Sequence, residues 1–198
     1  MNIDSDVIRG IIFDLDGTLV DSHLDFDALR QETGCPQGVG LLEYLDTIED
    51  GDKQRQVKEV IQWHEESGAR SATWMDGAEE FLRVLSERDV RIGVFTRNSR
   101  EIAGVMLARL GVPCDDLVAR EDAPAKPDPA GIHKMLADWQ LEPNQVLCLG
   151  DFRYDLEAAK AAGISAGLYD PSGDSPYRAL ADFCVAHFDE LLEAWIGS

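Results

Sequence analysis

The chain has few basic residues for its size. Of its 198 residues, 18 are Lys or Arg and 38 are Asp or Glu, which gives a formal net charge of −20. Nucleic acids and anionic membrane surfaces are bound through basic patches, so this balance argues against both as partners. An anionic small molecule would need positive charge from a metal ion or from a few well-placed side chains.

Cysteines are also few, and their spacing excludes the common structural metal sites. The four cysteines form no CxxC pair, and Cys148 lies inside the apolar run VLCLGD, where a buried free thiol is expected. No apolar stretch approaches the length of a membrane-spanning helix, and no signal-like leader opens the chain. These absences predict a protein of the reducing cytoplasm.

Apolar, β-branched runs recur along most of the chain and predict six strands. They lie at residues 7–14, 90–96, 115–120, 144–151, 164–170 and 183–187. Helical patterns separate most of them, at residues 78–87, 100–110, 129–139 and 154–162. Strands that alternate with helices of this length predict an α/β protein with a Rossmann-like parallel sheet and helices on both faces.

One segment departs from this alternation. Residues 22–75 contain apolar positions at helical spacing and no strand-like run, and turn signals at residues 34–38 and 50–52 divide the segment into about three helices. We therefore predict an α/β core built from residues 1–21 and 76–198, with residues 22–75 inserted as an all-helical domain.

The first predicted strand ends in two acids. In DLDGTLVD, Asp14 and Asp16 are separated by one residue, although neighbouring carboxylates repel each other and are costly to bury unpaired. One interpretation is a solvated acidic turn. The other is a site where a cation holds the acids together and one of them performs chemistry.

Polar residues also follow the other strands. Thr96 ends the second strand in FTRN, Asp151 ends the fourth in LGD, and Asp155 follows four residues later. Lys126 lies in AKPDP, just before the helix that leads to the fourth strand. Each residue alone is unremarkable, but ligands of open parallel sheets bind beyond the carboxyl ends of the strands. Their shared edge therefore favours a functional site.

The order of these motifs resembles a known family. DLDGTLVD, FT, KPDP and GDFRYDLEAAKAAG are similar to the four motifs of the haloacid dehalogenase-like hydrolases, in their phosphatase branch, and the resemblance covers the whole chain. It implies that residues 22–75 are the small helical cap of that family. It also implies a Mg²⁺-dependent phosphatase that hydrolyses a small phosphate monoester through an aspartyl-phosphate. An acid at Asp16 favours phosphoryl chemistry over carbon–halogen cleavage.

Within this resemblance, four residues are expected to be catalytic. Asp14 would be the carboxylate nucleophile. Asp16 lies two residues later, so strand geometry would send its side chain to the same side, where it would be the general acid and base. Thr96 would supply a hydroxyl and Lys126 a positive charge to the phosphate.

The metal and phosphate ligands are expected close by. Mg²⁺ would be held by Asp14, the backbone carbonyl of Asp16 and Asp151, with Asp155 orienting this shell through water. Gly17 would let backbone N–H groups approach the phosphate. The other residues assigned to phosphate or substrate binding are Thr18, Arg97 and Asn98.

Two alternatives remain beside the phosphatase. A phosphosugar mutase of the same family would return the phosphoryl group to a sugar, but would need an additional acid or base from its cap. A signalling receiver domain would be phosphorylated on Asp without turnover, but would have no helical insertion. The sequence leaves open the substrate, the oligomeric state, the cap residues that touch substrate, and the roles of His23, Arg153 and Tyr154.

Overall fold

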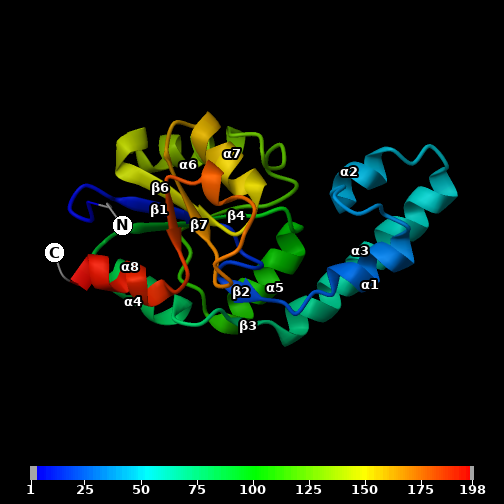
Figure 1. Cartoon of the computed structure of the whole chain (residues 1–198), viewed down its shortest axis with the longest axis horizontal. Coiled ribbons are helices and arrows are strands. Elements are labelled where there is room, and N and C mark those ends of the chain that lie inside the picture. The colour runs from blue at the N-terminus through cyan, green and yellow to red at the C-terminus, as the bar shows by residue number, and fades with distance from the viewer. Residues whose placement is uncertain (1–3, 197–198) are drawn as a thin grey trace. The chain divides into compact units, whose positions relative to one another are not determined.

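The computed structural model describes residues 4–196, which divide into two compact units (Figure 1). The α/β unit combines Met1–Asp21 with Thr73–Ser198, and the helical unit is Ser22–Ala72. Each unit is described by itself. The assignment of residues 22–75 as a cap stays a prediction.

The α/β unit contains a parallel sheet of six strands in the order β5-β4-β1-β6-β7-β8. The strands are β1 (Gly10–Phe13), β4 (Arg91–Phe95), β5 (Asp116–Val118), β6 (Val146–Gly150), β7 (Ser165–Tyr169) and β8 (Phe183–Val185). Each lies within one of the six predicted runs, so the predicted fold class is confirmed. β1 lies between β4 and β6, with Phe13 paired to Val94 and Leu149. The residue that follows β1 therefore emerges in the middle of the sheet edge.

A second, smaller pairing was not predicted. β2 (Val20–Asp21) and β3 (Thr73–Trp74) form an antiparallel pair where the chain leaves the α/β unit and returns to it. Two-residue strands carry no periodicity that a sequence pattern could reveal.

Helices cover both faces of the sheet, as predicted. They are α4 (Ala78–Glu87), α5 (Arg100–Leu110), α6 (Ala130–Trp139), α7 (Arg153–Ala161) and α8 (Phe188–Ile196), with short 3₁₀ turns at Pro143–Gln145 and Arg178–Leu180. Figure 1 shows α6 and α7 on one side of the sheet, and α4 and α8 on the other. The first four of these helices match the predicted helical patterns, whereas α8 was not predicted.

Alternation along β1 sends neighbouring side chains into two different cores. Ile12 packs with Ile132 of α6 and Leu156 of α7. Phe13 points to the opposite face and meets Phe81 of α4 edge-on, with ring centroids 6.3 Å apart. Phe81 in turn contacts Trp195 of α8 at 5.4 Å. With both faces packed, β1 holds the residues that follow it rigidly.

The helical unit has three helices, the number predicted. They are α1 (Phe26–Thr33), α2 (Leu41–Asp46) and α3 (Gly51–Ser71). Leu29, Val57 and Ile61 form a small buried core between α1 and α3. Asp50 caps α3 by accepting hydrogen bonds from the Asp52 and Lys53 N–H groups. The unit therefore has its own apolar core.

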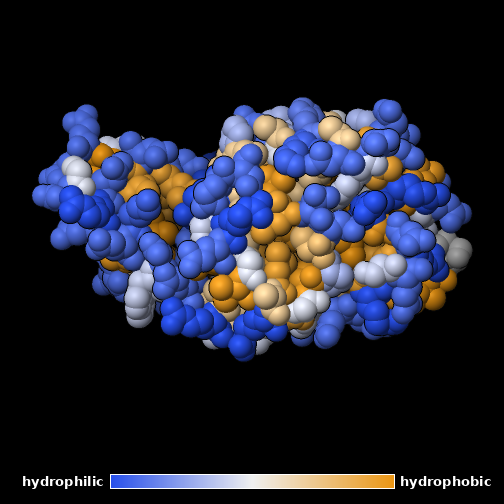
Figure 2. All heavy atoms as spheres, turned by 180° about the vertical axis from the view of Figure 1, so that it is seen from behind, coloured by the Kyte–Doolittle hydropathy of each residue, from blue (hydrophilic) through white to orange (hydrophobic). Residues whose placement is uncertain are grey.

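The surface reflects the charge of the chain. In the face shown by Figure 2, hydrophilic residues cover most of the molecule and hydrophobic residues gather in patches between them. Within residues 4–196, none of the helices has the length and apolar character needed to cross a membrane.

Candidate active site

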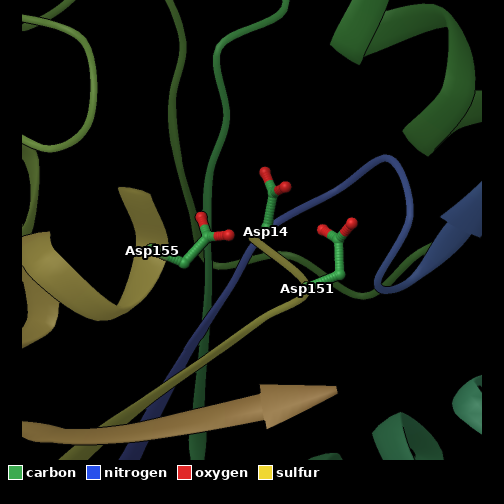
Figure 3. Close-up of side chains that lie close together, drawn as sticks. All are labelled: Asp14, Asp151 and Asp155. Carbon is green, nitrogen blue, oxygen red and sulfur yellow. The ribbon is translucent and has the colours of Figure 1, made fainter. Parts of the chain in front are cut away.

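Three carboxylates converge at the carboxyl edge of the sheet. Asp14 directly follows β1, Asp151 directly follows β6, and Asp155 lies in the first turn of α7 (Figure 3). One carboxylate oxygen from each lies within 4.8 Å of the others. Because β1 and β6 are hydrogen-bonded neighbours, their ends bring together residues far apart in the sequence.

A buried lysine lies against two of these carboxylates. Lys126 Nζ is 2.7 Å from Asp14 Oδ1 and 2.5 Å from Asp155 Oδ1. The Lys126 and Asp155 side chains are each 3% exposed, whereas Asp14 is 15% exposed. Asp14 is therefore the member of this group that solvent, and a substrate, can reach.

The crowding of acids shifts their proton affinities. Burial, opposed by Lys126 and reinforced by Asp155, raises the pKa of Asp14 to about 6. Burial and the neighbouring Asp14 and Asp155 raise the pKa of Asp151 well above its usual value. Burial disfavours the ammonium of Lys126, but Asp14 and Asp155 outweigh it and raise the pKa of that lysine. One ammonium is thus insufficient to neutralise three carboxylates.

The turn after β1 requires glycine at position 17. Gly17 has a φ of +88°, and a Cβ there would lie 2.7 Å from Asp151 Oδ2. The turn also directs the Thr18 hydroxyl at Asp151, with Thr18 Oγ1 and Asp151 Oδ1 3.3 Å apart. Thr18 is fully buried, and its hydroxyl donates to a carboxylate of the site instead of facing solvent.

The turn also changes the argument for Asp16. β1 ends at Phe13, and the Leu19 and Val20 N–H groups donate back to the Leu15 carbonyl, so residues 15–19 form a turn. Strand alternation therefore does not determine the side to which Asp16 points. Its carboxylate is partly buried and lies outside the three-carboxylate cluster, within the part of the chain described. Its role as general acid and base stays a prediction.

Asp155 is fixed by its place at the start of α7. Its Oδ2 accepts the Phe152 N–H at 3.0 Å, which leaves Oδ1 for Lys126. Gly150 makes room for it, since a Cβ there would lie 2.2 Å from Asp155 Cγ. The sequence predicted Asp155 as a residue that orients the metal shell, and the structure adds its direct ion pair with Lys126.

The loop after β4 carries the remaining predicted residues. Thr96 is buried, and its Oγ1 accepts the Asn98 N–H at 3.1 Å. Arg120 binds the same loop from the neighbouring β5 side: its N–H donates to the Asn98 carbonyl and its Nε to the Arg97 carbonyl. Arg97 and Asn98 are half-buried. Nine of the ten predicted site residues thus lie on the turns and loops that follow β1, β4 and β6 or in the first turn of α7, and the tenth, Lys126, lies between β5 and α6.

The donor set suits a hard divalent cation. Carboxylate oxygens are the ligands that Mg²⁺ and Ca²⁺ prefer. Burial, with a smaller contribution from neighbouring acids, raises the pKa values of Asp14 and Asp151, and a bound cation would stabilise their charged forms. Asp14, Asp151 and Asp155 are therefore the residues that could hold it.

Two features of the site were missed by the sequence analysis. One is the Lys126–Asp155 ion pair. The other is the stacking of Arg97 and Arg153 on the Tyr154 ring, with their Cζ atoms 4.7 and 4.8 Å from its centroid. The only sequence signal for the second is a basic and an aromatic residue inside GDFRYD, which does not predict a contact with a distant loop.

Comparison with known proteins gives this arrangement a family context. The family model described as haloacid dehalogenase-like hydrolase matches residues 11–168. Phosphoglycolate phosphatase from Rhodospirillum rubrum is 30% identical over 224 residues, covering 96% of this chain and 91% of the relative. N-acetylmuramic acid 6-phosphate phosphatase from Pseudomonas aeruginosa is 25% identical over 217 residues, covering 94% of each protein.

Solved structures show the same fold. The magnesium-bound YfnB of Bacillus subtilis superimposes with a TM-score of 0.70 at 16% identity, covering 95% of this chain and 98% of that one. The likeness extends over both units of the chain, but at this identity it concerns the fold alone.

Proposed function

The chain belongs to the haloacid dehalogenase-like hydrolases and is a phosphatase, and from this premise we propose that it hydrolyses a small phosphate monoester by way of a phosphoryl group carried on Asp14. The observation that carries the proposal is the position of Asp14. Two carboxylates of the cluster, Asp14 and Asp151, are partly exposed, and Asp14 is the one of these two that is paired with a buried ammonium. A phosphate at this point would meet a nucleophile and a positive charge together.

Two displacements at phosphorus make up the reaction. A carboxylate oxygen of Asp14 attacks phosphorus and the bond to the leaving oxygen breaks, with Asp16 donating a proton to that oxygen. Asp16 then takes a proton from water, whose oxygen attacks the same phosphorus and releases inorganic phosphate. Asp14 returns as the free carboxylate. Lys126 stays charged and offsets the phosphate's negative charge throughout.

Mg²⁺ is the cation we propose for the cluster, with Asp14, the Asp16 carbonyl and Asp151 as ligands and Asp155 behind them. When bound, it would supply positive charge to the phosphate oxygens and relieve the repulsion among the acids. The carboxylate cluster and its raised pKa values support this choice. The magnesium-bound YfnB shows that one protein of this fold binds the ion.

The helical unit fits the role of a small cap. We propose that residues 22–75 exclude water and select the substrate, which the α/β unit then dephosphorylates. The separate core of this unit supports the assignment, because the unit is compact by itself. A small phosphorylated metabolite of the cytoplasm is the proposed substrate.

An acid-quench experiment on Asp16→Asn tests the two-step reaction. The variant keeps the nucleophile but lacks the base that activates water, so a phosphoryl group should accumulate on Asp14 when an activated ester such as p-nitrophenyl phosphate is supplied. Intact mass spectrometry should then find one added phosphoryl group, which wild type lacks.

The control is the double variant Asp14→Asn/Asp16→Asn, which has no nucleophile and should remain unlabelled. Esters with a poor leaving group should lose more rate in Asp16→Asn than p-nitrophenyl phosphate does, because they need the proton. If both ester types slow equally and no adduct forms, Asp16 is not the general acid and base.

A further inference from the structure

Three side chains beside the carboxylates have no place in the reaction above. Arg97 follows β4, whereas Arg153 and Tyr154 open α7 after β6. The two guanidinium groups pack on the Tyr154 ring at 4.7 and 4.8 Å, and Arg153 also donates a hydrogen bond to the Tyr154 hydroxyl at 3.1 Å. We refer to Arg97 and Arg153 as the arginine pair.

The position of the arginine pair follows from the strand order. β4 and β6 are the two neighbours of β1, so a contact between the loops that follow them crosses the end of β1. Asp14 lies at that end, and Asp151 is two residues before Arg153. The Arg97–Tyr154 contact therefore lies alongside the catalytic carboxylates, within the α/β unit.

The backbone that carries Arg97 is held in place. Arg120 donates to the carbonyls of Arg97 and Asn98, at 2.8 and 3.0 Å. On the other side, Arg153 is the first residue of a nine-residue helix whose Asp155 caps its own N-terminus. Both guanidinium groups thus project from anchored segments, and little order remains to be gained when a ligand binds.

The placement of Arg153 is electrostatically unusual. Helix N-termini favour anions, yet α7 begins with this arginine. The chain has 38 acidic residues, and Arg83, Arg100 and Arg178 each form an ion pair with one of them. Over residues 4–196, Arg153 has no salt bridge, and its Nε–H is buried without a hydrogen-bond acceptor. A buried donor without an acceptor is costly, so this position is suited to an anion that the protein does not supply.

We propose that the arginine pair is a second anion subsite, which binds a carboxylate carried by the substrate a few bonds from its phosphate. This inference rests on the proposed function, because it takes the phosphate itself to lie at Asp14 and Lys126. A guanidinium presents parallel N–H groups that match the two oxygens of a carboxylate. Both guanidinium groups contact the Tyr154 ring, and the proposed carboxylate would pair with them beside it. The subsite would select phosphorylated hydroxy acids over neutral phosphate esters.

A pair of nearly isosteric substrates tests the subsite. 2-Phosphoglycolate carries the carboxylate, and 2-phosphoglycolamide replaces it with a neutral amide of the same shape. Wild type should prefer the carboxylate in kcat/KM by roughly 10- to 100-fold, as expected for charge-assisted hydrogen bonds. The preference should fall to about 3-fold or less in Arg153→Gln and in Arg97→Gln, and recover partly in Arg153→Lys.

Arg100→Gln is the matched control, because Arg100 follows the same loop but pairs with Asp122. It should keep the wild-type preference. An arginine pair that only offsets the nearby carboxylates would lower kcat/KM for both substrates by the same factor, which would overturn the proposal. Equal turnover of both substrates by wild type would also overturn it, while leaving the proposed phosphatase intact.

Binding gives a readout that does not depend on turnover. Calorimetry with 3-phosphonopropionate and its amide, which the enzyme cannot hydrolyse, should show the same preference in wild type and its loss in Arg153→Gln. If p-nitrophenyl phosphate releases phosphate but neither 2-phosphoglycolate nor its amide does, the subsite fails while the proposed phosphatase stands. If wild type binds 3-phosphonopropionate and its amide equally well, the subsite is contradicted whatever the turnover measurements show.

Discussion

Replacement of Asp14 by Asn should abolish phosphate release and leave the fold intact. The amide cannot attack phosphorus, so kcat should fall by roughly 10³- to 10⁶-fold, the range seen when a nucleophile is removed. The free energy of unfolding should change by less than about 1 kcal/mol. Lys126 keeps its ion pair with Asp155, and one of the mutually repelling carboxylates disappears.

Phosphate release and thermal unfolding, measured on the same preparations, check both parts. Asp138→Asn is the control, because Asp138 is an exposed carboxylate that pairs with Lys134 on the surface of α6. It should retain wild-type activity. Residual turnover of Asp14→Asn above the level explained by deamidation would remove Asp14 as the nucleophile.

Replacement of Lys126 by Met should cost both stability and activity. The change leaves the buried carboxylates of Asp14 and Asp155 without their ammonium, and removal of one member of a buried ion pair typically costs about 3–5 kcal/mol. Denaturant unfolding of wild type and variant would measure the difference. Mg²⁺ should return part of the lost stability, because a bound cation replaces some of the missing charge.

Lys134→Met provides the comparison. Lys134 and Asp138 form an exposed ion pair, which is expected to contribute no more than about 1 kcal/mol. Equal, small losses in the two variants would mean that Lys126 does not hold the carboxylates of the site together.

The sequence was sufficient to predict the framework of the site. Residues such as Asp14, Thr96 and Asp151 follow apolar strands, and parallel strands bring such residues to one edge regardless of their separation in the sequence. The helices between the strands could also be predicted from the sequence, since their apolar residues repeat at helical spacing.

Contacts between loops could not be predicted from the sequence in the same way. The Arg97–Tyr154 stacking joins residues that share no periodicity, and it depends on side-chain packing across the end of β1. The Lys126–Asp155 ion pair is similar, because Asp155 could be recognised by its motif but its partner could not. Strand alternation does not apply to Asp16 for a local reason, because the chain leaves β1 at Phe13 and turns, so the orientation of its side chain stays a prediction.

The helix α8 was not predicted from the sequence, for a different reason. Its apolar residues Leu191 and Trp195 are buried, with Trp195 packed against Phe81 of α4. The segment is nine residues long and lies at the end of the chain, where a short pattern has little context. Tertiary packing, rather than the strength of the local pattern, accounts for this helix.

Continuous phosphate release from p-nitrophenyl phosphate, with Mg²⁺ and then with excess chelator, tests the central claim most directly. A phosphatase that uses Asp14 and a divalent cation should release many equivalents of phosphate per chain, stop when the cation is removed, and resume when Mg²⁺ is returned. Full activity in excess chelator would contradict the metal assignment. Labelling that stops at one phosphoryl group per chain, or no phosphate release at all, would contradict the phosphatase itself.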